Sequence, residues 1–245
     1  MSAAPPRRAL RALDAVTMLV FAALMLALTL RLRPWFAAHP ELLVAVAIVS
    51  CAAADLVSGL FHWIGDTWGT PTTPIAGKLF ICPFREHHVD QLAITRHGFL
   101  EVNGATCLIS VPVALLAHTL PLDRAATGPG LMSAFLGTFL GWIFATNQFH
   151  KWAHIDQPPW LARHLQRWHV ILPAEHHRLH HTGRHDSYYC ITTGWLNAPL
   201  QRLRFFTGLE RLVTNLTGVQ PQHEDRHARE IVVRDGALLC AALPR

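Results

Sequence analysis

The stretch from Pro173 to Trp195 reads PAEHHRLHHTGRHDSYYCITTGW, and five histidines fall within ten of its residues. The five are His176, His177, His180, His181 and His185. Residues four apart share a face of a helix, so this spacing gives two helical pairs, and a third if the helix continues past Gly183. Imidazole is the commonest protein ligand for iron, zinc and copper. The spacing therefore predicts a metal site.

Two other interpretations of this cluster carry less weight. A solvated basic helix face would use lysine and arginine rather than near-neutral imidazoles. A cluster that senses pH is the second alternative. Metal binding is favoured by the spacing and by further histidines elsewhere in the chain.

The composition of the 245-residue chain indicates a membrane protein. Hydrophobic residues make up 51% and charged residues only 15%, with a mean hydropathy of +0.24, whereas about a quarter of the residues in a soluble domain are charged. The net charge of +5 comes without a basic stripe or motif, which disfavours nucleic acid and favours an anionic membrane surface. The five cysteines form no C-x-x-C pair, so no thiolate metal site is predicted.

Four apolar runs are long enough to cross a bilayer as helices. They cover about 15–35, 42–63, 103–121 and 131–149. The first run resembles a signal peptide, but no small-residue cleavage site follows it at Arg31-Leu32-Arg33-Pro34, so we expect an uncleaved span. Residues 160–168 and 200–212 have the spacing of amphipathic helices, and 188–193 is a β-prone run.

The positive charges predict the orientation of these spans. Four spans place both termini on one side, and all but three of the 21 lysines and arginines lie on that side. The exceptions are Arg31, Arg33 and Arg124. Because cytosolic segments carry the excess of lysine and arginine, we expect both termini in the cytosol. The predicted fold is an all-α, multi-pass membrane protein of four transmembrane helices with a cytosolic histidine-rich cap of amphipathic helices.

The same topology brings histidines from four segments to the cytosolic face. The predicted metal ligands are His62, His87, His88, His150, His154, His176, His177, His180, His181 and His185. Five residues that would support these ligands or join them are Asp66, Glu86, Asp90, His97 and Glu175. The acids would accept the second imidazole N–H and fix its tautomer, unless they pair with arginine at the surface. Asp55 is a further functional candidate, because a charge is costly inside an apolar span.

The number of imidazoles indicates more than one metal ion. A zinc site needs three or four ligands, and about ten imidazoles suffice for two ions. Many nitrogen ligands with few carboxylates suit iron or copper, so a di-iron centre that activates O₂ at an unactivated C–H bond of a lipid fits best. A zinc-dependent membrane lipid hydrolase and a non-catalytic scaffold or metal carrier are the alternatives. The chain has no flavin or haem motif, so an acidic electron donor such as cytochrome b5 or ferredoxin is expected.

Several segments resemble the Kua-type lipid desaturase family. They are DLVSGLFHWIGDTWG at 55–69, PFREHHVD at 83–90, AITRH at 93–97, TNQFHKWAH at 146–154, EHHRLHH at 175–181 and YCITTGWLN at 189–197. The resemblance covers about 42–218, which we expect to form the lipid desaturase domain. A tail and the first helix would occupy 1–41, and a polar tail without assigned structure would occupy 219–245.

The resemblance implies an oxidoreductase with two iron ions that reduces O₂ and inserts the vinyl-ether double bond of plasmalogens into a 1-O-alkyl (plasmanyl) ethanolamine phospholipid. The family's histidine boxes fall on His150/His154 and His181/His185, and the other predicted ligands match further motif positions. A plant branch of the family desaturates an acyl chain of phosphatidylglycerol, so acyl desaturation is the alternative reaction. This sequence has Gly98 where the family usually has Asp, and Gln91-Leu92 where it has Pro-Thr. Neither difference removes a ligand, but both would alter the substrate slot.

Overall fold

The computed structural model describes residues 7–122, 127–182 and 184–222, and these residues form helices and loops without a strand. The all-α fold predicted from the sequence is confirmed. The expectation of a β-prone run at 188–193 is wrong for this segment, which has no strand partner. Three of its N–H groups donate hydrogen bonds to the side chains of Asp55 and Ser58, which lie on the helix Pro40–Thr67.

Four helices are long and apolar enough to cross a membrane, as the apolar runs predict. They are α1 (Arg7–Ala38), α2 (Pro40–Thr67), α5 (Phe99–Thr119) and α6 (Thr127–Ala153). The helices continue beyond the apolar runs into polar residues, because an existing helix gains one hydrogen bond for each residue that is added to it. As a result, His62 and Asp66 lie on α2, and His150 lies on α6.

Shorter helices connect and follow these spans. They are the π-helix η1 (Gly77–Ile81), α3 (Cys82–Val89), α4 (Ala93–Arg96), α7 (Trp160–Arg167), α8 (Ala174–His180), α9 (Asn197–Arg202) and α10 (Phe205–Thr217). The helix expected at 200–212 is two helices, because Arg204 between them adopts a left-handed backbone with φ of 52°. Helix α8 ends before Gly183, so His181 and His185 do not form a helical pair.

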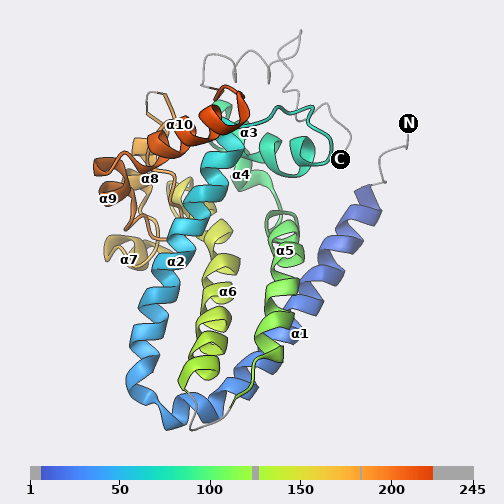
Figure 1. The fold of residues 1–245 in the computed structure, drawn as a ribbon. Helices are drawn as coiled ribbons and strands as arrows, with labels where there is room; N and C mark the ends of the chain where they lie inside the picture. The colour runs from blue at the N-terminus through green and yellow to red at the C-terminus, as the bar shows by residue number, and fades with distance from the viewer. Residues whose placement is uncertain (1–6, 123–126, 183, 223–245) are drawn as a thin grey trace. The chain divides into compact units, whose positions relative to one another are not determined.

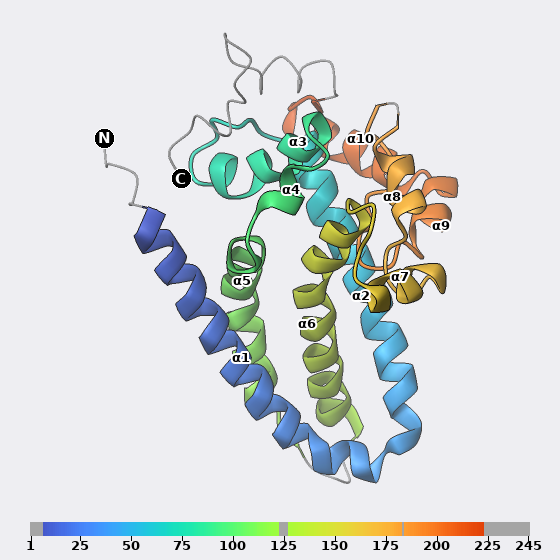
Figure 2. The same cartoon turned by 180° about the vertical axis from the view of Figure 1, so that it is seen from behind.

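The described residues divide into two compact units. The helical unit comprises 7–54, 98–122 and 127–148, and the histidine unit comprises 55–97, 149–182 and 184–222. In the helical unit α1 packs along α5 (Figure 1), and Figure 2 shows the same pair from behind. The core of this unit is built from apolar side chains such as Leu28, Cys107 and Leu140, with a few buried polar residues such as Ser133. The predicted ligands all belong to the histidine unit.

Candidate metal centre

The candidate ligands come from four segments of the histidine unit. Helix α2 supplies His62, and α3 supplies the neighbours His87 and His88. The end of α6 and the residue that follows it supply an i, i+4 pair, and α8 with the residue after it supplies three more. These five are His150, His154, His177, His180 and His181. Residues four apart on a helix share one face, which is why His150 and His154 lie in one group, as do His177 and His181.

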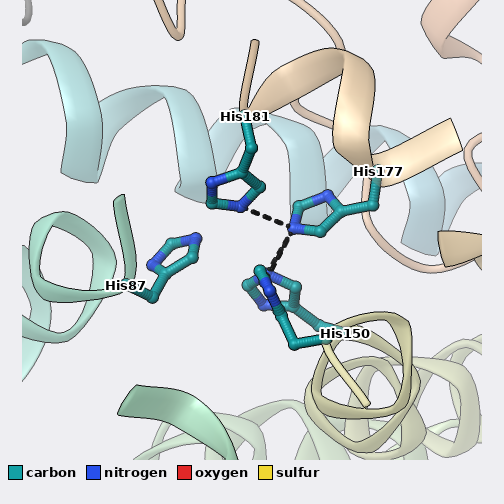
Figure 3. Close-up of side chains that lie close together, drawn as sticks. His87, His150, His177 and His181 are labelled. Carbon is teal, nitrogen blue, oxygen red and sulfur yellow. Dashed lines mark hydrogen bonds between the residues drawn. The ribbon is translucent and has the colours of Figure 1, made fainter. Parts of the chain in front are cut away.

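The first group of imidazoles, named site 1, consists of His87, His150, His154, His177 and His181. Their ligand atoms all lie within 4.8 Å of one another. The Nε2 atom of His177 lies 2.9 Å from that of His150, 3.0 Å from that of His154 and 3.0 Å from that of His181. Figure 3 shows the rings of His150, His177 and His181 turned toward one another, with His87 facing them.

The geometry of site 1 fits a metal ion. Two ligands at right angles, each about 2.1 Å from an ion, lie about 3.0 Å apart. The Nε2 atoms of His150, His154 and His177 are mutually within 3.2 Å. A neutral imidazole carries a single N–H, so hydrogen bonds alone satisfy such a triangle poorly, and lone pairs that converge in this way are stabilised by a cation.

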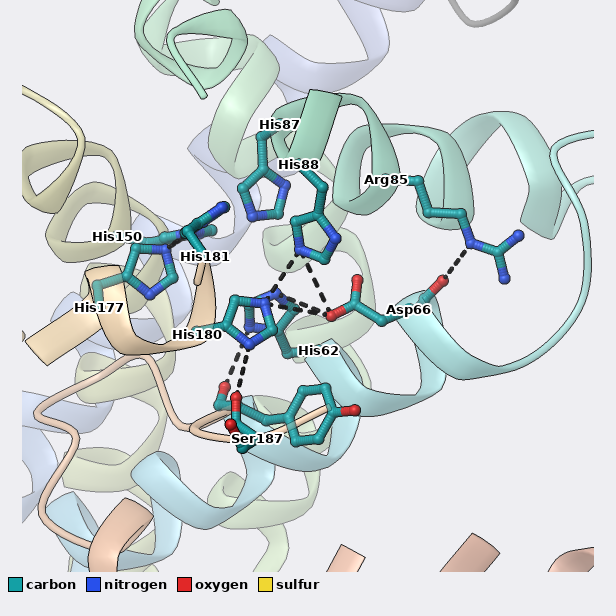
Figure 4. A network of polar contacts seen from close by, with 12 residues as sticks. His62, Asp66, Arg85, His87, His88, His150, His177, His180, His181 and Ser187 are labelled. Atoms are coloured by element: carbon teal, nitrogen blue, oxygen red, sulfur yellow. Dashed lines mark hydrogen bonds and ion pairs between the residues drawn. The ribbon is translucent and has the colours of Figure 1, made fainter. Parts of the chain in front are cut away.

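The second group, named site 2, combines imidazoles with a carboxylate. Its imidazoles are His62, His87, His88 and His180. The Oδ2 atom of Asp66 lies 3.3 Å from Nε2 of His62, 3.4 Å from Nε2 of His180 and 3.6 Å from Nε2 of His88 (Figure 4). Asp66 is only 2% exposed. Because His87 belongs to both groups, the two sites adjoin.

Backbone carbonyls fix the tautomers of three imidazoles in site 2. The Nδ1 atom of His62 lies 3.1 Å from the carbonyl oxygen of Tyr189, and that of His180 lies 2.7 Å from the carbonyl oxygen of Ser187. The Nδ1 atom of His87 lies 3.2 Å from a carbonyl oxygen one turn earlier in α3. A carbonyl only accepts, so each Nδ1 carries the proton and each Nε2 presents a lone pair to the site.

The charge state of the imidazoles also suits metal binding. Burial, together with the neighbouring imidazoles, holds the pKa of His87, His88 and His177 well below the ordinary value for histidine. Burial and the neighbouring His180 lower the pKa of His154 to about 4. These rings are therefore neutral at pH 7, which is the form that binds a metal.

Two of the predicted ligands lie outside both groups. The ring of His176 packs against Tyr188 with centroids 5.3 Å apart, and its Nε2 accepts a hydrogen bond from the side-chain amide of Asn197 at 3.2 Å. The ring of His185 stacks on His88 with centroids 4.2 Å apart and planes 12° apart. His185 therefore lies beside site 2, whereas His176 faces another part of the histidine unit.

The predicted supporting residues differ in their positions. Asp66 lies against the ligands, as described above. Asp90 forms an ion pair with Arg96, the ordinary surface pairing that we named as the alternative. Glu86 is half-buried on α3, and Glu175 is exposed in the first turn of α8. The backbone carbonyl of His97 accepts a hydrogen bond from Nζ of Lys151 at 2.6 Å.

Arg85 is a structural residue of the site that the sequence reasoning missed. The side chain is fully buried, and its guanidinium donates to the carbonyl oxygens of Gly65, Trp68 and Gly69 at 3.0–3.1 Å. These carbonyls belong to the last turn of α2 and the residues after it. Arg85 thus ties α3, with His87, to the end of α2 (Figure 4). An arginine inside a histidine motif gives no signal of this role in the sequence.

Comparisons with known proteins agree with this chemistry. Residues 51–224 match the lipid desaturase domain family. The chain is 49% identical to plasmanylethanolamine desaturase of Myxococcus xanthus over 93% of this chain and 82% of that protein. It is 45% identical to plasmanylethanolamine desaturase 1 of Mus musculus over 76% and 70%, and 34% identical to the chloroplastic fatty acid desaturase 4 of Arabidopsis thaliana over 69% and 51%. No solved structure matches the chain.

Proposed function

The chain belongs to the lipid desaturase domain family, and from this premise we propose that it is an O₂-dependent oxidoreductase that forms the vinyl-ether double bond of plasmalogens. Its substrate would be a plasmanyl ethanolamine phospholipid. Two relatives that this chain matches over most of their length are named plasmanylethanolamine desaturases. The observation that carries the proposal is the adjoining pair of imidazole groups with Asp66 beside one of them.

We propose that sites 1 and 2 each hold one iron ion. Eight imidazoles with one carboxylate beside them, and no thiolate among the groups, suit iron better than a structural zinc. When bound, the pair of ions supplies O₂ activation and the removal of hydrogen from an unactivated C–H bond. The chain's own work is to hold the imidazoles neutral, to fix the tautomers of three of them through carbonyls and to place one negative charge at site 2.

The electron donor and the sidedness of the site are part of the same proposal. Arg163 and Arg167 on α7 and Arg178 on α8 are exposed in the histidine unit. A small acidic carrier such as cytochrome b5 or ferredoxin would be attracted to this positive surface. The orientation with both termini and the metal centre in the cytosol rests on the distribution of lysine and arginine.

Desaturation of a phospholipid acyl chain is the second candidate. It is supported by the 34% identity to a fatty acid desaturase over 69% of this chain. Both reactions remove two neighbouring hydrogens from a lipid chain, and they differ in whether the new double bond adjoins the ether oxygen.

The test is lipid analysis of a plasmalogen-deficient cell line that expresses the full chain. We expect ethanolamine lipids that release an aldehyde in mild acid, only in the presence of O₂, and protein that retains an iron ion in each of its two sites. New acyl double bonds without acid-labile lipid would favour the second candidate. Lipid hydrolysis under strict anaerobiosis would instead favour a zinc hydrolase and overturn the proposal.

A further inference from the structure

A buried carboxylate on α2 binds a segment of backbone far away in the chain. Asp55 is 0% exposed, and its Oδ1 accepts hydrogen bonds from the N–H groups of Thr192, Thr193 and Gly194 at 2.8–3.1 Å. Its Oδ2 accepts a fourth from the N–H of Leu196 at 3.1 Å. A buried carboxylate is tolerated only when its charge is compensated, and four N–H donors provide this compensation.

The bound segment, residues 187–197, is named the strap. It lies directly on α2, because a Cβ added at Gly59 would come within 2.6 Å of the Cys190 Sγ and 3.2 Å of the Cys190 N. One turn of α2 after Asp55, the Oγ of Ser58 accepts a hydrogen bond from the N–H of Ile191 at 3.1 Å. Asp55, Ser58 and Gly59 therefore hold the strap against one face of α2.

The strap also supplies the carbonyls that orient two ligands of site 2. The Tyr189 carbonyl accepts from Nδ1 of His62, and the Ser187 carbonyl accepts from Nδ1 of His180. Both rings then present Nε2 toward the carboxylate of Asp66. The hydrogen bonds that the Asp55 carboxylate accepts from the described residues come from the strap and not from these ligands.

We propose that Asp55 is a positioning residue for site 2: it fixes the strap, and the strap fixes the tautomer and orientation of His62 and His180. This inference rests on the proposed metal centre. Loss of the carboxylate leaves four N–H groups, three of them buried, without their acceptor, so the strap leaves α2 and its carbonyls leave the two rings. Site 1 receives no carbonyl of the strap at His150 or His154 and keeps its metal.

The release of the strap has a readout that needs no metal, because Cys190 lies within it. Cys190 is fully buried, and burial raises the pKa of its thiol well above the ordinary value, so the thiol is protected from alkylation. Cys51 and Cys107, both in the helical unit, are buried as well and serve as internal references for the rest of the fold.

The first experiment measures alkylation of the metal-free, full-length protein by N-ethylmaleimide, cysteine by cysteine, using mass spectrometry. In Asp55→Ala we expect Cys190 to react about tenfold faster than in the wild type, or more. A factor of this size corresponds to the loss of one charge-assisted hydrogen bond. Asp55→Asn keeps one oxygen acceptor and should lie between wild type and Asp55→Ala. The reference cysteines should stay protected in both variants.

A matched control is Ser133→Ala, which removes a buried hydroxyl that donates to the carbonyl of Ala117 at 3.0 Å in the helical unit. It should leave Cys190 protected. If Cys190 reacts in Asp55→Ala at the wild-type rate, the proposal is wrong. Equal exposure of Cys51, Cys107 and Cys190 would also overturn it, because Asp55 would then hold the whole fold rather than the strap.

The second experiment measures Co²⁺ bound per chain, with absorption spectra of the bound ion. We expect Co²⁺ in both sites of the wild type and in Ser133→Ala, and in site 1 alone in Asp55→Ala. Unchanged Co²⁺ binding in a variant whose Cys190 is released would refute the link from the strap to the ligands. If the wild type binds no Co²⁺, the proposed metal centre fails, while the alkylation of Cys190 still decides whether Asp55 holds the strap.

Discussion

The Oδ2 atom of Asp66 lies 3.3 Å from Nε2 of His62, one helical turn earlier on α2, and both side chains are buried. An i, i+4 pair of this kind needs no tertiary contact to form, because the helix alone places both groups on one face. The same Oδ2 atom is within 3.6 Å of Nε2 of His88 and His180, which come from other segments. The carboxylate thus lies at the point where three segments of site 2 meet.

Replacing Asp66 by Asn removes this negative charge while keeping the shape of the side chain. We expect the affinity of site 2 for Fe²⁺ or Co²⁺ to fall by about 100-fold, at the upper end of the range for groups that support metal ligands, and desaturation to fall with it. Metal titration of purified protein measures the effect. Asp90→Asn is the control, because it weakens the ion pair with Arg96 and keeps an oxygen acceptor for the N–H of Leu92, and equal losses in both variants would contradict the assignment.

His176 and His177 are neighbours on α8 that face different surroundings, which makes them a matched pair. His177→Gln should lose the metal of site 1, because Nε2 of His177 is within 3.0 Å of three other Nε2 atoms. His176→Gln should keep both metals, since His176 lies outside both groups and hydrogen-bonds to Asn197. Metal analysis of the two purified variants checks this, and comparable metal loss in His176→Gln would place it among the ligands.

The metal-free protein should lose stability in mild acid. The pKa values of His154 and His185 in the folded chain are about 4, lowered from 6.5 first by burial and then by His180. Between these values the unfolded chain binds more protons than the folded chain, so stability is full above about pH 6.5 and falls as the pH drops toward 4. Thermal unfolding of chelator-treated protein at several pH values measures this. A thermal unfolding midpoint that stays constant from pH 7 to pH 4 would contradict this prediction.

Gly59→Ala should displace the strap, because the new Cβ would lie 2.6 Å from the Cys190 Sγ. Overpacking of this kind costs about 1–3 kcal/mol, and Cys190→Ala in the same chain should recover part of that loss by removing the sulfur. Gly141→Ala is the control, since nothing lies within 4 Å of a Cβ added there. Unfolding midpoints of the four proteins test the prediction, and a stable Gly59→Ala protein would show that the strap can shift without loss.

The sequence predicts the helical parts of this protein well because helices leave local patterns. Apolar runs identify all four spans, and i, i+4 spacing identifies the pair of His150 and His154. The pattern does not show which of the two faces of α8 is used, because His176/His180 and His177/His181 have the same spacing. The tertiary surroundings decide this, and they place His177, His180 and His181 in the groups but not His176.

Contacts between distant segments are the part that local patterns do not reveal. The charge of Asp55 within an apolar span indicates a functional candidate, yet its partners lie more than 130 residues away in the strap. The β-branched residues of that segment favour a strand by propensity. In the structure, acceptors on α2 bind N–H groups that a strand would have offered to a neighbouring strand. The carbonyls of Ser187 and Tyr189 leave no sequence signature at all.

His87 belongs to both groups, so the two proposed ions would share it as a donor. With this ring directed toward one ion, the other would have one donor fewer, so occupancy of either site would change the affinity of its neighbour. Binding of the two ions would therefore be interdependent, and a titration curve for two equivalent and independent sites would not describe it.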